Sequence, residues 1–174
     1  MALNEHEIIA SVSVYLLNEG NADIESIAVK RNSHRGFIKS KLQKNGISKK
    51  KIENITFNTK GTDINAYYEF DTGRIQRRMI IEAKGGTTHY NLYTALGQFI
   101  CSKKSPSTYY WFGFAFPYSW REKTRERLTN GGEINPIINL LLDEYTKNGQ
   151  GLYFYFVKEN GETTKETWRQ TLRS

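Results

Sequence analysis

Cysteine, proline and long apolar runs are scarce in this sequence. Of its 174 residues one is a cysteine, Cys101, and three are prolines, so an internal disulfide is excluded and a reducing compartment is expected. The first residues lack the basic start and apolar stretch of a secretion signal, and no apolar run is long enough to cross a bilayer. We therefore expect a cytoplasmic protein with no membrane partner.

Aromatic and basic residues, by contrast, are abundant. Aromatic side chains make up 13% of the chain, and 25 Lys and Arg residues against 18 Asp and Glu residues give a net charge of +7. Surplus positive charge favours a polyanionic partner such as a nucleic acid, although moderate basicity alone identifies no function. The hydrophobic share of 38% favours one packed domain over residues 1–174.

The spacing of apolar residues predicts an α/β fold, with a mixed sheet flanked by helices. Helical spacing covers 3–17, 90–103, 119–128 and 137–147, and strand patterns cover 55–58, 64–70, 79–84, 109–116 and 152–157. Asn160-Gly161 predicts a hairpin turn after the last of these strands. The segment 21–51 is polar and basic; it is either an insertion that meets the substrate or a solvated surface, with a helix near 36–44.

Two acidic residues and a lysine fall at the same end of the predicted hairpin. Asp63 opens one strand, and Glu82-Ala83-Lys84 closes its antiparallel partner. Because side chains alternate along a strand, Glu82 and Lys84 point to one face and Ala83 to the other. Two carboxylates and the backbone carbonyl of Ala83 suit Mg²⁺, and the Lys84 ammonium suits an attacking water or a phosphate. The plainer alternative is two surface carboxylates beside a lysine at a strand edge.

Thr62-Asp63 … Glu82-Ala83-Lys84 resembles the motif of the PD-(D/E)xK nuclease superfamily, and the resemblance is most specific over 61–98. It implies a restriction-endonuclease-like fold in which the matching Asp and Glu bind Mg²⁺, with Mn²⁺ as a substitute, and the matching Lys assists the attacking water. Thr62 stands where the family motif has proline.

The same resemblance implies two supporting residues. The helix before the motif often supplies another acid, for which Glu7 is the candidate, although an acid near a helix start is also favoured by the helix dipole. The helix after the motif often presents a glutamine toward the site. Gln98, in the run Ala-Leu-Gly-Gln, is that candidate, and certain DNA-excision control factors of this fold carry a similar run. An exposed, inert glutamine is the alternative.

Basic residues gather in several short clusters. Arg77 and Arg78 lie on the hairpin that carries the acidic pair, and Lys49, Lys50 and Lys51 follow one another in the basic segment. We interpret these five as nucleic-acid contacts, because cations that neutralise phosphates supply most of the affinity for nucleic acids. A cluster of this kind is also common on a merely solubilising face.

The sequence thus predicts a Mg²⁺-dependent endonuclease that hydrolyses DNA, working as a homodimer because one such site cuts one strand at a time. Two alternatives stay open: a non-cleaving DNA-binding accessory or control factor of the same fold, and a basic interaction protein whose carboxylates are incidental. An RNA substrate also stays open, since nothing in the sequence reads a 2′-hydroxyl.

Overall fold

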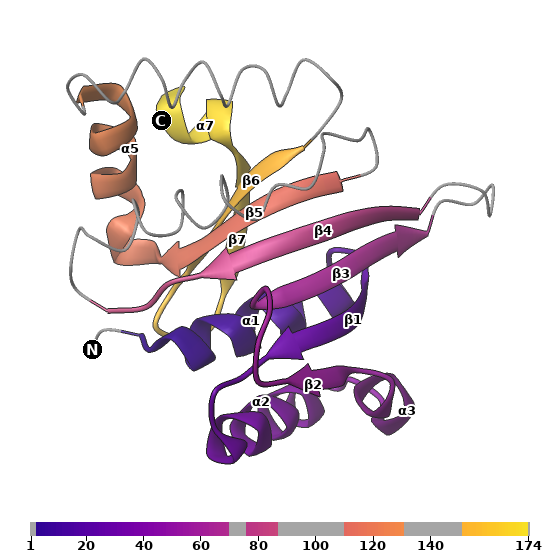
Figure 1. The fold of residues 1–174 in the computed structure, drawn as a ribbon. Coiled ribbons are helices and arrows are strands. Elements are labelled where there is room, and N and C mark those ends of the chain that lie inside the picture. The colour runs from indigo at the N-terminus through magenta and orange to yellow at the C-terminus, as the bar shows by residue number, and fades with distance from the viewer. Residues whose placement is uncertain (1–2, 70–75, 87–109, 131–150, 174) are drawn as a thin grey trace.

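The computed structural model describes residues 3–69, 76–86, 110–130 and 151–173. These residues form one domain, a seven-stranded mixed sheet with helices on both faces (Figure 1). The predicted α/β class, a mixed sheet flanked by helices, is confirmed. Within the described residues, no helix combines the length and apolar character needed to span a membrane.

The elements follow the predicted order over most of the described chain. The strands are β1 (Asp23–Ala28), β2 (Thr56–Asn58), β3 (Ile64–Glu69), β4 (Gln76–Ala83), β5 (Tyr110–Pro117), β6 (Leu152–Val157) and β7 (Thr163–Thr167). The helices are α1 (Glu5–Asn18), α2 (Asn32–Lys44), α3 (Lys49–Glu53), the 3₁₀ turn η1 (Tyr118–Trp120), α5 (Arg121–Asn130) and α7 (Trp168–Arg173). The helices predicted over 90–103 and 137–147 lie outside the described residues.

The strands lie in the order β2-β1-β3-β4-β5-β6-β7. Antiparallel pairing joins β1 to β3, β3 to β4 and β6 to β7, while β1–β2, β4–β5 and β5–β6 are parallel. The β3–β4 hairpin and the β6–β7 hairpin are the two that the sequence predicts. Strand β5 lies between two other strands with apolar side chains on both faces, as expected for a central strand.

One face of the sheet is covered by α1, against which α2 packs. Ile8, Val12 and Leu16 recur every fourth residue along α1 and are fully buried, which is the spacing of one helix face. They belong to the same apolar core as Ile64 of β3 and Ile81 of β4. The side chains of β3 and β4 that share this parity therefore point toward α1.

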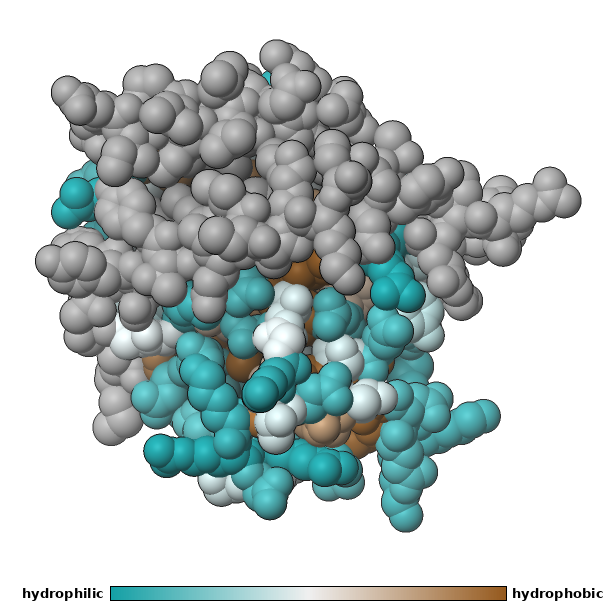
Figure 2. Space-filling view, viewed as in Figure 1, coloured by the Kyte–Doolittle hydropathy of each residue, from teal (hydrophilic) through white to brown (hydrophobic). Residues whose placement is uncertain are grey.

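The opposite face is rich in aromatic side chains. Phe114 and Phe116 of β5 stack on each other and pack at a tilt against Phe154 of β6. Trp120 of η1 and Trp168 of α7 belong to the same core. Hydrophilic side chains, by contrast, dominate the lower part of the molecule around α2 and α3 (Figure 2).

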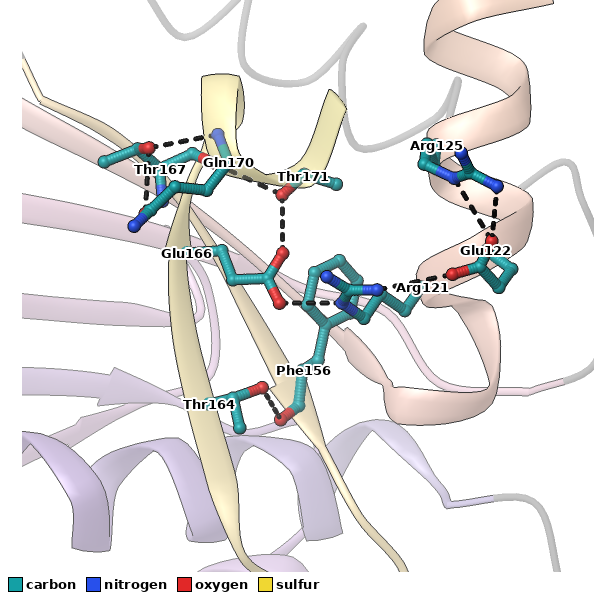
Figure 3. Close-up of polar contacts among 9 residues, drawn as sticks. All are labelled: Arg121, Glu122, Arg125, Phe156, Thr164, Glu166, Thr167, Gln170 and Thr171. Atoms are coloured by element: carbon teal, nitrogen blue, oxygen red, sulfur yellow. Dashed lines mark hydrogen bonds and ion pairs between the residues drawn. The ribbon is translucent and has the colours of Figure 1, made fainter. Parts of the chain in front are cut away.

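An ion pair ties α5 to the end of the sheet (Figure 3). Nε of Arg121 donates to Oε1 of Glu166 on β7 at 2.7 Å, and Oε2 of Glu166 accepts from the hydroxyl of Thr171 on α7 at 3.1 Å. Both charged side chains are largely buried, at 18% and 16% exposure. Hydrogen bonding to Glu166 raises the pKa of Arg121, so this network holds three elements together with its charges matched.

The segment 21–51 contributes a strand to the sheet and a helix to its cover. β1 lies between β2 and β3, and α2 packs on α1. The register of β1 on β3 shifts between Ile24 and Ser26, and this bulge turns Ile24 and Ile27 into the same core. Apolar residues three apart do not show the alternation of a strand, so the sequence pattern misses β1.

Candidate functional site

The register of the β3–β4 hairpin places the predicted acidic pair. Ile64 pairs with Ile81, so Asp63, one residue earlier, lies across from Glu82, one residue later. Ile64 and Ile81 are buried on the α1 side. By strand alternation, Asp63, Glu82 and Lys84 lie on the other face. The structure thus brings these three residues together at one end of the hairpin, as the sequence predicts.

The three side chains form a compact cluster. Nζ of Lys84 lies 3.7 Å from Oδ2 of Asp63 and 3.7 Å from Oε2 of Glu82. The N–H of Ala83 donates to Oδ2 of Asp63 at 2.7 Å. All three charged side chains are 12–13% exposed. One ammonium is therefore shared by two largely buried carboxylates.

Burial makes both carboxyl groups unusually weak acids. Burial raises the pKa of Asp63, and the charge of Lys84 and the Ala83 amide offset this only in part. The pKa of Glu82 is raised to about 7 by burial and then by the charge of Asp63, against the pull of Lys84. A pair that resists double ionisation is short of positive charge, and a divalent cation would supply it.

The donor set fits a hard cation. Carboxylate oxygens of Asp63 and Glu82 and the backbone carbonyl of Ala83 are the ligands that Mg²⁺ prefers. Within the described residues, no three His, Cys, Asp or Glu side chains gather closely enough to hold a metal. A cation between Asp63 and Glu82 would therefore complete its coordination with water, as Mg²⁺ usually does.

The acid that α1 offers to this site is Glu5 rather than Glu7. The carboxylate of Glu7 turns back and accepts the N–H of Asn4 at 2.7 Å, which caps the helix. Glu5 and Asp63 both line a groove between α1, α2 and the turns that follow β1 and β2. The charge of Glu5 adds to the raised pKa of Asp63. Residues two apart lie on nearly opposite sides of a helix. The pattern Asn-x-x-Glu is a capping signal, so the sequence already held the sign that assigns Glu7 to the cap.

Gly85 allows the start of α1 to lie against the end of β4. The N–H of Gly86 donates to the carbonyl of Leu3 at 3.2 Å. A Cβ on Gly85 would meet the backbone N of Glu5 and would come within 2.6 Å of the Leu3 oxygen. A glycine immediately after Lys84 is therefore what lets Glu5 approach the acidic pair.

Most of the predicted nucleic-acid contacts lie elsewhere. Arg78, Lys50 and Lys51 line a second groove, which has a volume of about 700 Å³. Arg78 lies 3.4 Å from Glu25 and Lys51 lies 3.7 Å from Asp23. Arg78 precedes Glu82 by four strand residues, about 13 Å, so this groove is at the far end of the hairpin.

Of the other predicted residues, one lies on the opposite face, one on the surface and one outside the described part of the chain. Arg77 has the strand parity of Ile81, and its guanidinium lies 4.9 Å from the ring centre of Trp111. Lys49 is exposed beside Glu53 at 3.7 Å. Gln98 lies outside the described residues.

Comparison of the chain with known protein families, with curated proteins and with solved structures yields no match.

Proposed function

We propose that this protein is a Mg²⁺-dependent endonuclease that hydrolyses DNA phosphodiester bonds. The observation that carries the proposal is the cluster in which Lys84 lies 3.7 Å from both Asp63 and Glu82, all three side chains being 12–13% exposed. A purely structural ion pair needs one acid for each base. Here a second carboxylate is held away from water, at a cost that a cation and a phosphate would offset.

Each residue has a defined part in the proposed reaction. Asp63, Glu82 and the carbonyl of Ala83 would hold Mg²⁺, or Mn²⁺ in its place, with Glu5 beside them. The bound cation supplies Lewis-acid charge and makes water a stronger acid. Lys84 orients the attacking water and balances charge on the phosphoryl oxygens. The water oxygen bonds to phosphorus and gives up a proton, the ester P–O bond breaks, and the leaving oxygen takes up a proton.

The charge of the chain and its sequence support the same function. The net charge of +7 favours a polyanionic substrate, and the motif at Asp63, Glu82 and Lys84 resembles that of the PD-(D/E)xK nucleases. We further propose a cytoplasmic setting, in keeping with a single cysteine. Cutting both strands of a duplex at one place calls for two such sites, which a two-fold homodimer provides.

A cleavage assay tests the proposal. Supercoiled, linear, single-stranded and branched DNA, and RNA in parallel, are incubated with the wild-type protein in Mg²⁺ or in EDTA. Asp63→Ala and Lys84→Ala are tested beside Lys44→Ala, which removes an exposed lysine of α2. We expect Mg²⁺-dependent cutting that both site variants lose and the control keeps. Salt-sensitive DNA binding with no cutting of any substrate would instead support a non-cleaving accessory factor.

A further inference from the structure

A groove of about 700 Å³ reaches Asp63 of the acidic pair, at the opposite end of α1 and β1 from the far-end groove. It lies between α1, α2 and the turns that follow β1 and β2, with Asp63 in its wall. The charged and aromatic side chains that line it, apart from Asp63, are Glu5, His6, Lys30, Arg31, His34 and Lys60. A concave surface of this size is typical of a ligand site, and it shares its acids with the proposed nuclease site.

The cations of this groove are open to a phosphate. Arg31 and Lys60 are exposed, and in the described part of the chain neither has an acidic side chain within ion-pair distance. Lys30 lies 3.6 Å from Glu5 but is itself 81% exposed, and such exposed pairs hold weakly. In the far-end groove, Lys51 and Arg78 each lie beside an acid, in pairs that are themselves about half exposed.

Aromatic rings accompany these cations. The imidazoles of His6 and His34 stack with ring centres 4.1 Å apart and planes 12° apart. The ring of Phe37 meets His6 edge-on at 5.2 Å and is 40% exposed, a large share for a phenylalanine. On the same helix, α2, Arg35 lies over the ring of Phe57 at 5.2 Å. Basic and aromatic side chains thus lie next to one another in the groove and along the outer side of α2.

We infer that this groove binds an unpaired nucleic-acid strand and leads it to the acidic pair, with Arg31 and Lys60 on its phosphates and the His34–Phe37 side receiving its bases. The inference rests on the proposed function, because it concerns the substrate of that same site. Positive grooves with aromatic platforms are the common design for single-strand binding. Bases inside a duplex are stacked on one another, so their faces cannot reach such rings.

The test measures binding without cutting. Fluorescence anisotropy is recorded in EDTA with a labelled 12-nucleotide single strand and with a 12-base-pair duplex, at 50 and 200 mM KCl. We expect the wild-type protein to bind the single strand at least about 5-fold more tightly, since one base stacked on an aromatic ring contributes that much or more. Arg31→Ala/Lys60→Ala should weaken binding by about 10-fold and flatten the log–log salt slope by about 1.4, or 0.7 for each lost phosphate contact.

A second double variant tests the aromatic contacts. His34→Ala/Phe37→Ala should weaken single-strand binding by about 5-fold or more and leave duplex binding within about twofold, because its loss is confined to stacking. Both positions lie on the outer part of α2, and circular dichroism checks that each variant is folded. Lys44→Ala/Arg127→Ala is the matched control, since it removes two exposed cations that line neither groove.

Three results would overturn the inference: groove variants that bind like the control, a wild-type protein that prefers the duplex, or an aromatic variant that loses duplex and single strand equally. Because the assay contains no metal and no cutting, its outcome is separate from that of the nuclease proposal. Loss of cutting in Asp63→Ala with single-strand binding kept or strengthened, as expected when a carboxylate leaves the groove wall, supports both. Groove-dependent binding by a protein that cuts nothing supports the groove alone.

Discussion

The molecule holds two largely buried polar clusters of opposite design. At the α5–β7 end, Arg121 and Glu166 meet at 2.7 Å, and Thr171 satisfies the second carboxylate oxygen (Figure 3). At the β3–β4 end, Asp63 and Glu82 share Lys84 at 3.7 Å. The first cluster has two bases, Arg121 and Arg125, for two acids, Glu166 and Glu122. The second has one base for two acids.

The difference in charge balance between the two clusters is reflected in the pKa values of their residues. The pKa of Arg121 is raised because Glu166 stabilises its charged form. The pKa of both Asp63 and Glu82 is raised because burial opposes their charged forms. A matched pair stabilises the fold, whereas an unmatched one costs stability and is retained where function needs it.

Neutralising one acid in each cluster gives the largest expected contrast. Glu82→Gln should lower the rate of Mg²⁺-dependent cutting by about 1,000-fold, because it removes a proposed cation ligand and its charge. Glu166→Gln, a change of the same size, should leave the rate within about twofold. Single-turnover cleavage at saturating enzyme measures both. Equal losses in the two variants would mean that the β3–β4 cluster has no special part in the chemistry.

Removing the buried acid Glu166 should lower stability more than removing the exposed acid Glu122. Glu166→Ala removes the largely buried partner of Arg121, leaves the exposed Glu122 at 3.3 Å, and should lower the free energy of unfolding by about 3 kcal/mol. Glu122→Ala, which removes an acid 57% exposed, should cost under about 1 kcal/mol. Urea unfolding followed by circular dichroism gives both values. A loss at Glu166 as small as that at Glu122 would contradict a structural role for the pair.

The pH dependence of the free energy of unfolding should reveal the raised pKa of Glu82. The folded pKa of Glu82, about 7, lies above its ordinary value of 4.5. Protonated Glu82 therefore contributes stability that is complete below about pH 4.5 and is lost as the pH rises through 7. In EDTA, Glu82→Gln should gain about 2 kcal/mol over the wild-type protein on going from pH 5 to pH 8.

Urea unfolding at the two pH values measures that gain. Glu166→Gln, an acid-to-amide change of the same size outside this cluster, is the control. A difference between wild type and Glu82→Gln that stays constant with pH would contradict the raised pKa.

The smallest expected effect concerns the contact that positions Glu5. A methyl group on Gly85 would meet the backbone of Leu3 and Asn4, each within 2.6 Å, so Gly85→Ala should lower the free energy of unfolding by about 1 kcal/mol or more. Gly36→Ala in α2 is the matched control, because a Cβ there meets nothing within 4 Å. It should raise stability by up to about 1 kcal/mol through helix propensity. Thermal unfolding separates the two signs.

The part of the site that lies within one hairpin could be predicted from the sequence. Strand alternation and the antiparallel return of a single hairpin bring Asp63, Glu82 and Lys84 to one end and one face. Strands β5 and β6 are likewise readable, since each is a continuous run of apolar and aromatic residues. These features depend on residues close together in the chain.

Other features could not be predicted from the sequence, because contacts between distant segments of the chain produce them. The bulge in β1 exists only against β3, and it removes the alternation that would have marked a strand. The capping pattern in the sequence assigns Glu7 to the helix cap, but the approach of Glu5 to Asp63 depends on how α1 meets Gly85. The groove that contains Asp63 takes its cations from two separate turns: Lys30 and Arg31 follow β1, and Lys60 follows β2. No continuous run of basic residues in the sequence therefore predicts it.

The sequence by itself determined the alternating faces of the strands, the acidic pair with its lysine, and the excess of positive charge. The tertiary structure decided which cations stand beside that pair and which are matched by acids at the far end. It also decided how far the carboxylates are removed from water, and so how weakly acidic they are. Local alternation follows from backbone geometry alone, whereas burial and the meeting of separate turns depend on the packing of the whole sheet and its helices.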